Sequence, residues 1–119
     1  MSANEVYELG VVYLQFSKQQ RLDFLASIRT NQCEIIQHVA YNTLLNSHIA
    51  LTIEDRNYLR KHIGAIRKLA SSKICLLEKR VILIKKAPVI HRLMKIAVEY
   101  IERERASLKS KSELELDSE

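Results

Sequence analysis

The chain has 119 residues, 47% of them hydrophobic, and its 19 Lys and Arg outnumber 14 Asp and Glu to give a net charge of +5. This length and hydrophobic content exclude a disordered chain and fit a single folded domain. Only two Gly and one Pro disfavour a fold built on tight turns, because turns use Gly and Pro at special backbone angles. We therefore predict an all-α bundle of four to six helices over 1–108, followed by an acidic, flexible tail over 109–119.

The first 45 residues predict three helices. We expect these helices over 3–16, 18–29 and 32–45. The first of these segments is mostly apolar and also fits a strand, but the helical pattern of the following segments favours a helix. Ser17 is suited to cap the second helix, and Asn31 with Glu34 fits a capping box for the third.

A fourth helix is predicted over 53–70, with Thr52 as its N-cap and two acidic residues in its first turn. Its hydrophobic residues share one face at 100° per residue. They are Leu59, Ile63, Ile66, Leu69 and Ala70. Its basic residues share the opposite face, and Arg56, Arg60 and Arg67 lie within about 40° of one another on a continuous helix. This face is the clearest candidate binding surface in the chain.

Two further helices are predicted over 73–86 and 88–108. The first is apolar around most of its circumference, so we expect it to be buried on more than one side, although Val81–Ile84 also fits a strand. The second begins at Pro88 and is strongly amphipathic. We expect its apolar face to dock into the bundle or onto a second copy of the chain. The candidate interface residues are Leu93, Ile96, Tyr100 and Ile101.

Charge is unevenly distributed along the chain. Residues 1–55 carry a net charge of −3, residues 56–95 carry +11, and residues 96–119 carry −3. Eleven positive charges within forty residues repel one another unless an anion lies nearby. That anion is a nucleic acid, an anionic membrane, an acidic partner or the chain's own acidic ends. The last helix carries Glu99, Glu102 and Glu104 among its bases, which disfavours an anionic membrane.

The basic block indicates contact with nucleic-acid phosphates, independent of base sequence and weakened by salt. The candidate phosphate-binding residues are Arg56, Arg60, Lys61, Arg67, Lys68, Lys73, Lys79, Arg80, Lys85 and Lys86. The alternative is a solvated basic face that only keeps the protein soluble. A helix-turn-helix over 53–86 is disfavoured, because the second helix is too apolar to expose base-reading side chains.

Catalytic and metal-binding motifs are absent from the sequence. It contains no Gly-rich phosphate loop, no GxSxG, no HExxH and no EF-hand pattern. Its four histidines lack the spacing of zinc ligands. They are His38, His48, His62 and His91. We therefore predict a protein that is not an enzyme, with no cofactor, no metal and no small-molecule substrate.

The two cysteines, Cys33 and Cys75, lie in apolar helical contexts without CxxC spacing. We interpret them as buried free thiols, and a disulfide between them stays open as the alternative. No signal peptide and no apolar run of about 20 residues is present, so no membrane span is expected. These features predict an intracellular protein of a reducing compartment.

The centre of the chain carries three consecutive motifs with departures. Leu45–Leu51 corresponds to a pattern Leu-(Asn)-Gly-Asn-x-Pro-Leu, with Ser47 and Ala50 in place of Gly and Pro. Leu59–Ala70 corresponds to LRKHKxxLRxLA. Ser72–Arg80 corresponds to KK-x-SLKKKRKLL with fewer lysines.

With these motifs, residues 42–86 resemble a family of small basic proteins encoded by Polinton/Maverick-type mobile elements and related adintovirus-like DNA viruses. The resemblance implies a virus- or element-encoded accessory or virion-core component associated with DNA, located in the nucleus or the virion. The lost lysines disfavour dense DNA condensation. Our leading hypothesis is therefore a non-enzymatic protein that binds the DNA backbone. The alternative is a homodimeric or other helical protein–protein interaction module without a nucleic-acid role.

Overall fold

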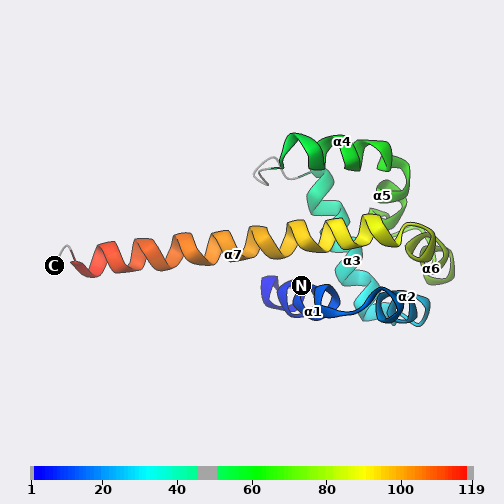
Figure 1. The fold of residues 1–119 in the computed structure, drawn as a ribbon, viewed down its shortest axis with the longest axis horizontal. Coiled ribbons are helices and arrows are strands. Elements are labelled where there is room, and N and C mark those ends of the chain that lie inside the picture. The colour runs from blue at the N-terminus through cyan, green and yellow to red at the C-terminus, as the bar shows by residue number, and fades with distance from the viewer. Residues whose placement is uncertain (1, 46–50, 118–119) are drawn as a thin grey trace.

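The computed structural model describes residues 2–45 and 51–117, with side chains as far as residue 110. The described residues form seven helices and no strand (Figure 1). The helices are α1 (Ala3–Gln15), α2 (Lys18–Ala26), α3 (Thr30–Leu45), α4 (Ile53–Lys61), α5 (Ile63–Ala70), α6 (Leu76–Lys85) and α7 (Ala87–Asp117). The all-α prediction is confirmed, and both segments that also fitted a strand, 3–16 and 81–84, are helical except for Phe16, which follows the end of α1.

The long helix α7 organises the molecule (Figure 1). It runs along the longest axis, with α1 and α2 on one side and α4 and α5 on the other, while α6 lies at the end where α7 begins. Each of the seven helices contributes buried side chains to one core, and the largest share comes from α7. The apolar face predicted for this helix is therefore confirmed, with Val89, Ile90 and Leu93 at most 1% exposed.

Side-chain caps begin α2 and α4 where the sequence predicts them. The Ser17 hydroxyl accepts a hydrogen bond from the Gln20 backbone N–H at 3.2 Å, and the Gln20 side chain accepts one from the Ser17 N–H at 2.8 Å. This capping box fixes the turn between α1 and α2. The Thr52 hydroxyl accepts a hydrogen bond from the Asp55 N–H at 3.0 Å.

The capping box predicted at Asn31 and Glu34 is wrong. Helix α3 begins two residues earlier than expected, and the Cys33 N–H already donates to the Arg29 carbonyl at 2.9 Å. The Gln32 side chain makes the reciprocal contact, accepting from the Arg29 N–H at 3.1 Å. Either Gln or Glu can occupy the third helical position of a capping box. The sequence offers both Gln32 and Glu34, and the choice of Glu34 placed the predicted start of the helix two residues too late.

The predicted helix 53–70 is two helices, so the described chain has seven helices rather than four to six. His62 has φ −114° and ψ 19°, which ends α4 and begins α5. Its imidazole contacts one residue outside the two helices, Lys86, and one residue of α4, Tyr58. The His62 Nδ1 lies 3.3 Å from Lys86 Nζ, and its ring centre lies 5.0 Å from that of Tyr58. Apolar periodicity cannot show a break that these neighbours stabilise.

The C-terminal part of α7 extends beyond the packed body. Arg105 still contacts α1, where its guanidinium donates to Asn4 Oδ1 at 2.6 Å and lies 4.3 Å from the Tyr7 ring centre. The helix continues to Asp117, so residues 109–117 of the expected tail are helical where they are described. The flexibility of this stretch stays a prediction. Among the described residues, no helix combines the length and hydrophobicity that a membrane crossing requires.

Candidate nucleic-acid interface

Helix α4 is held against α7 by its inner side chains, and this contact positions its basic face. Arg92 of α7 donates to Asp55 Oδ1 at 2.7 Å, and its guanidinium carbon lies 4.6 Å from the Tyr58 ring centre. Leu59, on the same inner side, is 6% exposed. With these residues turned inward, Arg56 and Arg60 are exposed on the outer side.

Three predicted phosphate-binding arginines line one shallow groove. Arg56 and Arg60 come from α4 and Arg67 comes from α5, and all three are exposed. The groove has a volume of about 450 Å³, and its other lining residues are mainly apolar. They are Thr43, Leu44, Leu51, Leu59, Ile63 and Ile66. In the part of the chain that the structure describes, none of the three guanidiniums forms a side-chain hydrogen bond or ion pair.

The three arginines lie together as predicted, but not because they share one face of a continuous helix. A continuous helix would have aligned Arg56, Arg60 and Arg67 as a straight stripe. The break at His62 removes that stripe, and the three residues instead share the groove along α4 and α5. The apolar lining contributed by α3 was not predicted, because only the tertiary packing of α3 on α5 brings Thr43 and Leu44 to the groove; Leu51 was not predicted there either.

The remaining predicted phosphate-binding residues fall into two groups. The first group is exposed. It consists of Lys61, Lys68, Lys73 and Lys85. None of these four lines the groove of the arginines. The second group is engaged by the protein itself. It consists of Lys79, Arg80 and Lys86.

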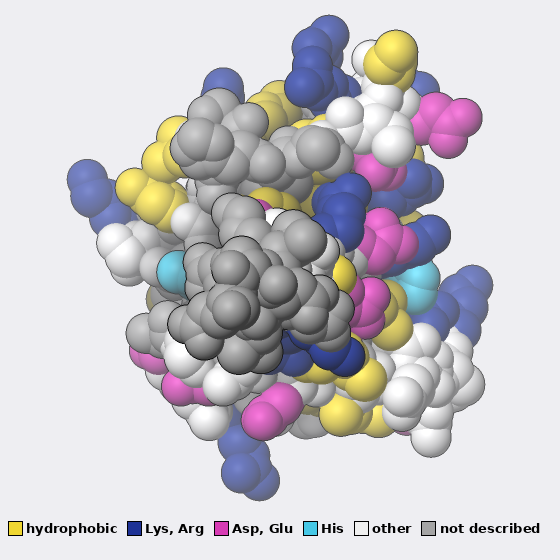
Figure 2. Space-filling view, turned by 90° about the vertical axis from the view of Figure 1, so that its left-hand side faces the viewer, with side chains coloured by type: hydrophobic (Ala, Val, Ile, Leu, Met, Phe, Trp, Pro, Cys, Tyr) yellow, Lys and Arg dark blue, Asp and Glu magenta, His cyan; other side chains and the backbone are white. Residues whose placement is uncertain are grey.

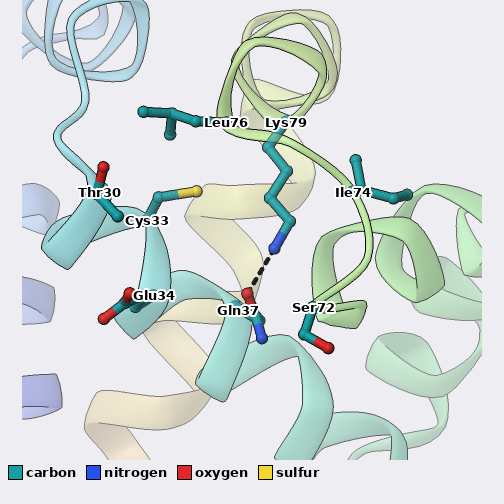
Figure 3. A pocket seen from close by; sticks show the side chains of 8 residues that line it. All are labelled: Thr30, Cys33, Glu34, Gln37, Ser72, Ile74, Leu76 and Lys79. Atoms are coloured by element: carbon teal, nitrogen blue, oxygen red, sulfur yellow. Dashed lines mark hydrogen bonds between the residues drawn. The ribbon is translucent and has the colours of Figure 1, made fainter.

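Lys79 lies in the interior, contrary to its predicted place on the surface. It is 4% exposed, and its ammonium donates to the Gln37 side chain across a hollow of about 300 Å³ (Figure 3). Figure 3 shows Lys79 reaching from α6 toward α3, while the carboxylate of Glu34 points away from it. The buried position removes Lys79 from any phosphate-binding face. Burial raises the pKa of the Cys33 thiol beside it, and the positive charges of Lys79 and Arg80 partly oppose that rise.

Arg80 and Lys86 also make contacts inside the chain. Two nitrogens of the Arg80 guanidinium donate to the Ile28 carbonyl, at 2.7 and 3.1 Å, and so connect α6 to the link between α2 and α3. Lys86 contacts His62 at the break between α4 and α5. These cations stabilise the packing of helices, a role that charge counting along the sequence does not separate from ligand binding.

Positive charge does not form one continuous patch at the C-terminal end of the molecule. Figure 2 looks along α7 from this end, and Lys and Arg side chains project around its edge, including the top, where α4 lies. Asp and Glu side chains lie between them on the right of the view. The groove of the three arginines is defined instead by the residues that line it.

The residues expected at a dimer interface on α7 belong to this chain's own core. Leu93, Ile96 and Ile101 are at most 9% exposed, and Tyr100 is half-buried against the core. Helices α1 and α3 pack against α7, which fills the face that a second copy would have occupied. The predicted interface is corrected accordingly.

The two cysteines differ in their surroundings. Both are free thiols, but only Cys33 is buried, and Cys75 is exposed at the position before α6. The prediction of two buried thiols is therefore wrong for Cys75. Among the described residues, no group of three or more His, Cys, Asp or Glu side chains lies together as metal ligands do. His48 lies outside the described residues.

A second polar cluster lies where α7 begins, apart from the arginine groove. Burial and the positive charges of Arg21, Lys95 and Arg92 lower the pKa of His91. Burial raises the pKa of the neighbouring Tyr13 to about 12 against the attraction of Arg21. Neither the Tyr13 hydroxyl nor the His91 Nδ1 has a hydrogen-bond partner in the described part of the chain.

Comparison with known proteins identifies no matching family model, no similar curated protein and no similar solved structure. The function of this chain is therefore inferred from its own residues.

Proposed function

We propose that the chain is a non-enzymatic DNA-binding protein that contacts the duplex backbone through the arginine groove of α4 and α5. The observation that carries this proposal is the placement of Arg56, Arg60 and Arg67 along one groove, exposed and without a carboxylate partner in the described residues. Guanidiniums bind phosphate oxygens through two parallel hydrogen bonds, and free ones are available to do so.

This mode of binding reads charge rather than base sequence. Three arginines on a surface groove can contact successive phosphates, whereas the exposed side of α6, the helix that follows, is centred on Leu77, Val81 and Ile84, which cannot read bases through hydrogen bonds. The resemblance of residues 42–86 to proteins of Polinton/Maverick-type elements supports a role in a virion core or as an accessory component, in the nucleus or the virion.

The test compares two triple variants with the same net charge. Arg56→Glu/Arg60→Glu/Arg67→Glu removes the groove cations, and Lys18→Glu/Arg29→Glu/Arg103→Glu reverses three exposed cations elsewhere. Each variant changes the net charge from +5 to −1, because each reversal subtracts two. Fluorescence anisotropy with two duplexes of unrelated sequence, at about 50 mM salt and above, measures the affinity and its salt dependence.

We expect the groove variant to bind at least about tenfold more weakly than the control variant. Its log–log salt slope should also be smaller than that of the wild type by about 2.7, if three phosphate contacts are lost. Circular dichroism checks that both variants keep their helices. Equal losses in the two variants would mean that net charge alone acts, and absence of wild-type binding at 50 mM salt would end the proposal.

A further inference from the structure

Helix α6 exposes a row of hydrophobic side chains along its outer side, which we call the α6 stripe. It consists of Leu77, Val81 and Ile84, which are 71%, 51% and 43% exposed. Their i, i+4, i+7 spacing places them on one side of the helix. Helix α6 does pack against several helices, but it is not buried around most of its circumference, since the side with Leu83 and Lys79 is covered and the stripe is exposed.

The α6 stripe faces away from the rest of the described chain. Helix α6 packs against α2, α3, α5 and α7 with its covered side. It lies at the end of the molecule opposite the projecting end of α7 (Figure 1). Contiguous exposed hydrophobic residues on a helix are typical of a surface that contacts another protein.

The charges beside the stripe indicate which protein that is. Glu78 and Lys85 are both exposed and lie about 20° apart around the helix, on the same flank of the stripe. Seven residues place them about 10.5 Å apart along the axis. In the described part of the chain they form no ion pair with each other or with another residue. One flank therefore presents a negative and a positive charge two helical turns apart.

We propose that the α6 stripe pairs with the α6 stripe of a second copy of this chain, with the two helices antiparallel about a two-fold axis at Val81. A two-fold axis perpendicular to both helices reverses the direction of the second helix but keeps its flank on the same side. Glu78 of each copy then lies opposite Lys85 of the other, and two identical ion pairs form. At the centre, the two Val81 side chains meet, and each Leu77 faces Ile84 of the second copy.

A parallel pairing of the two α6 helices would not bring Glu78 of one copy opposite Lys85 of the other. A parallel pair sets the two Glu78 at one level and the two Lys85 at another, so no opposite charges meet. The antiparallel dimer is self-complementary, as a two-fold interface requires. A contact limited to one ten-residue helix is smaller than the roughly 1,200–2,000 Å² of stable complexes, so the dimer should be weak. This inference does not rest on DNA binding and is tested without nucleic acid.

Sedimentation equilibrium of the full chain, from about 10 μM to about 1 mM, measures the dimer association constant directly as mass. We expect reversible dimer formation in the upper part of this range. Val81→Glu places two like charges together at the axis and should lower the association constant at least about thirtyfold. Val12→Glu is the matched control, because Val12 is a helical valine of similar exposure, 49%, on α1. It should leave dimer formation unchanged.

The charge pairs supply the decisive comparison. Glu78→Lys and Lys85→Glu should each weaken the dimer about threefold to tenfold, because each makes two like-charge contacts. The double variant exchanges the signs and should restore the wild-type association constant. A chain that is monomeric at 1 mM overturns the proposal. So does a dimer that survives Val81→Glu, one that Val12→Glu weakens equally, or a double variant as weak as the single ones.

Discussion

The three groove arginines of α4 and α5 and two arginines of α6 and early α7, Arg80 and Arg92, belong to the same basic stretch of the sequence, residues 56–95, but lie in different environments. Arg56, Arg60 and Arg67 are exposed along a groove and contact no carboxylate in the described residues. By contrast, Arg80 donates two hydrogen bonds to the Ile28 carbonyl, and Arg92 pairs with Asp55. The first group is available to a ligand, whereas the second holds helices together.

This difference separates two uses of positive charge that a charge count merges. A cation that satisfies an internal carbonyl or carboxylate contributes to folding, and its removal leaves a polar group without a partner. A cation on the groove contributes nothing comparable to folding, so its removal should change binding alone. The following variants test whether the division is real.

Loss of Arg80 should have the largest effect on stability. Arg80→Ala removes both hydrogen bonds to the Ile28 carbonyl, and a bond from a charged donor is worth about 1.5–3 kcal/mol. Urea denaturation should show a loss of about this size in the free energy of unfolding. Arg60→Ala, the control on the exposed groove, should stay within about 0.5 kcal/mol of the wild type. Similar losses in both variants would abolish the distinction between the two groups.

The two glycines extend the comparison from charge to packing. A Cβ at Gly10 of α1 would overlap Val98 Cγ2 of α7, whereas a Cβ at Gly64 of α5 meets no atom within 4 Å. Gly10→Ala should therefore destabilise by about 1–2 kcal/mol, since overpacking exceeds the gain in helix propensity. Gly64→Ala should stabilise by up to about 1 kcal/mol.

Thermal denaturation measures both glycine variants. Val98→Ala provides room for the new methyl group, so the double variant Gly10→Ala/Val98→Ala should lose less stability than the sum of its two single variants. Additive losses would show that the helices do not meet closely at Gly10.

Titration of His91 should produce the smallest effect. Its folded pKa is lowered by burial and by Arg21, Lys95 and Arg92, whereas its pKa in the unfolded chain is about 6.5. Below that pH the unfolded state binds more protons than the folded state, so the free energy of unfolding falls as the pH falls. His91→Gln should reduce this dependence between about pH 7 and pH 5, measured by urea denaturation at each pH. An unchanged pH profile would contradict the assignment.

Local signals in the sequence were sufficient for the fold class and most helix positions. The caps at Ser17 and Thr52 lie where they were predicted, because a cap depends on neighbours within four residues. The apolar face of α7 was also predicted, since its spacing repeats over several turns. The break at His62 was not predicted, because its contact with Lys86 comes from 24 residues away along the chain.

The candidate site was predicted only in part, because some of its features depend on how the helices pack against one another. The grouping of Arg56, Arg60 and Arg67 survives because residues of neighbouring helices can still meet at a groove. The burial of Lys79 and the exposure of Val81 depend on which side of α6 packs against the bundle. A helix with hydrophobic residues around its circumference does not specify that side.

The extension of α7 past Arg105 affects how the molecule moves in solution. The chain measures 56 × 27 × 26 Å, and its radius of gyration of 15.7 Å exceeds the roughly 13.5 Å of a compact domain of this length. A particle about twice as long as it is wide diffuses more slowly than a sphere of equal mass. A monomer of this chain should therefore elute early in gel filtration and resemble a larger species there, while its sedimentation mass stays that of one chain.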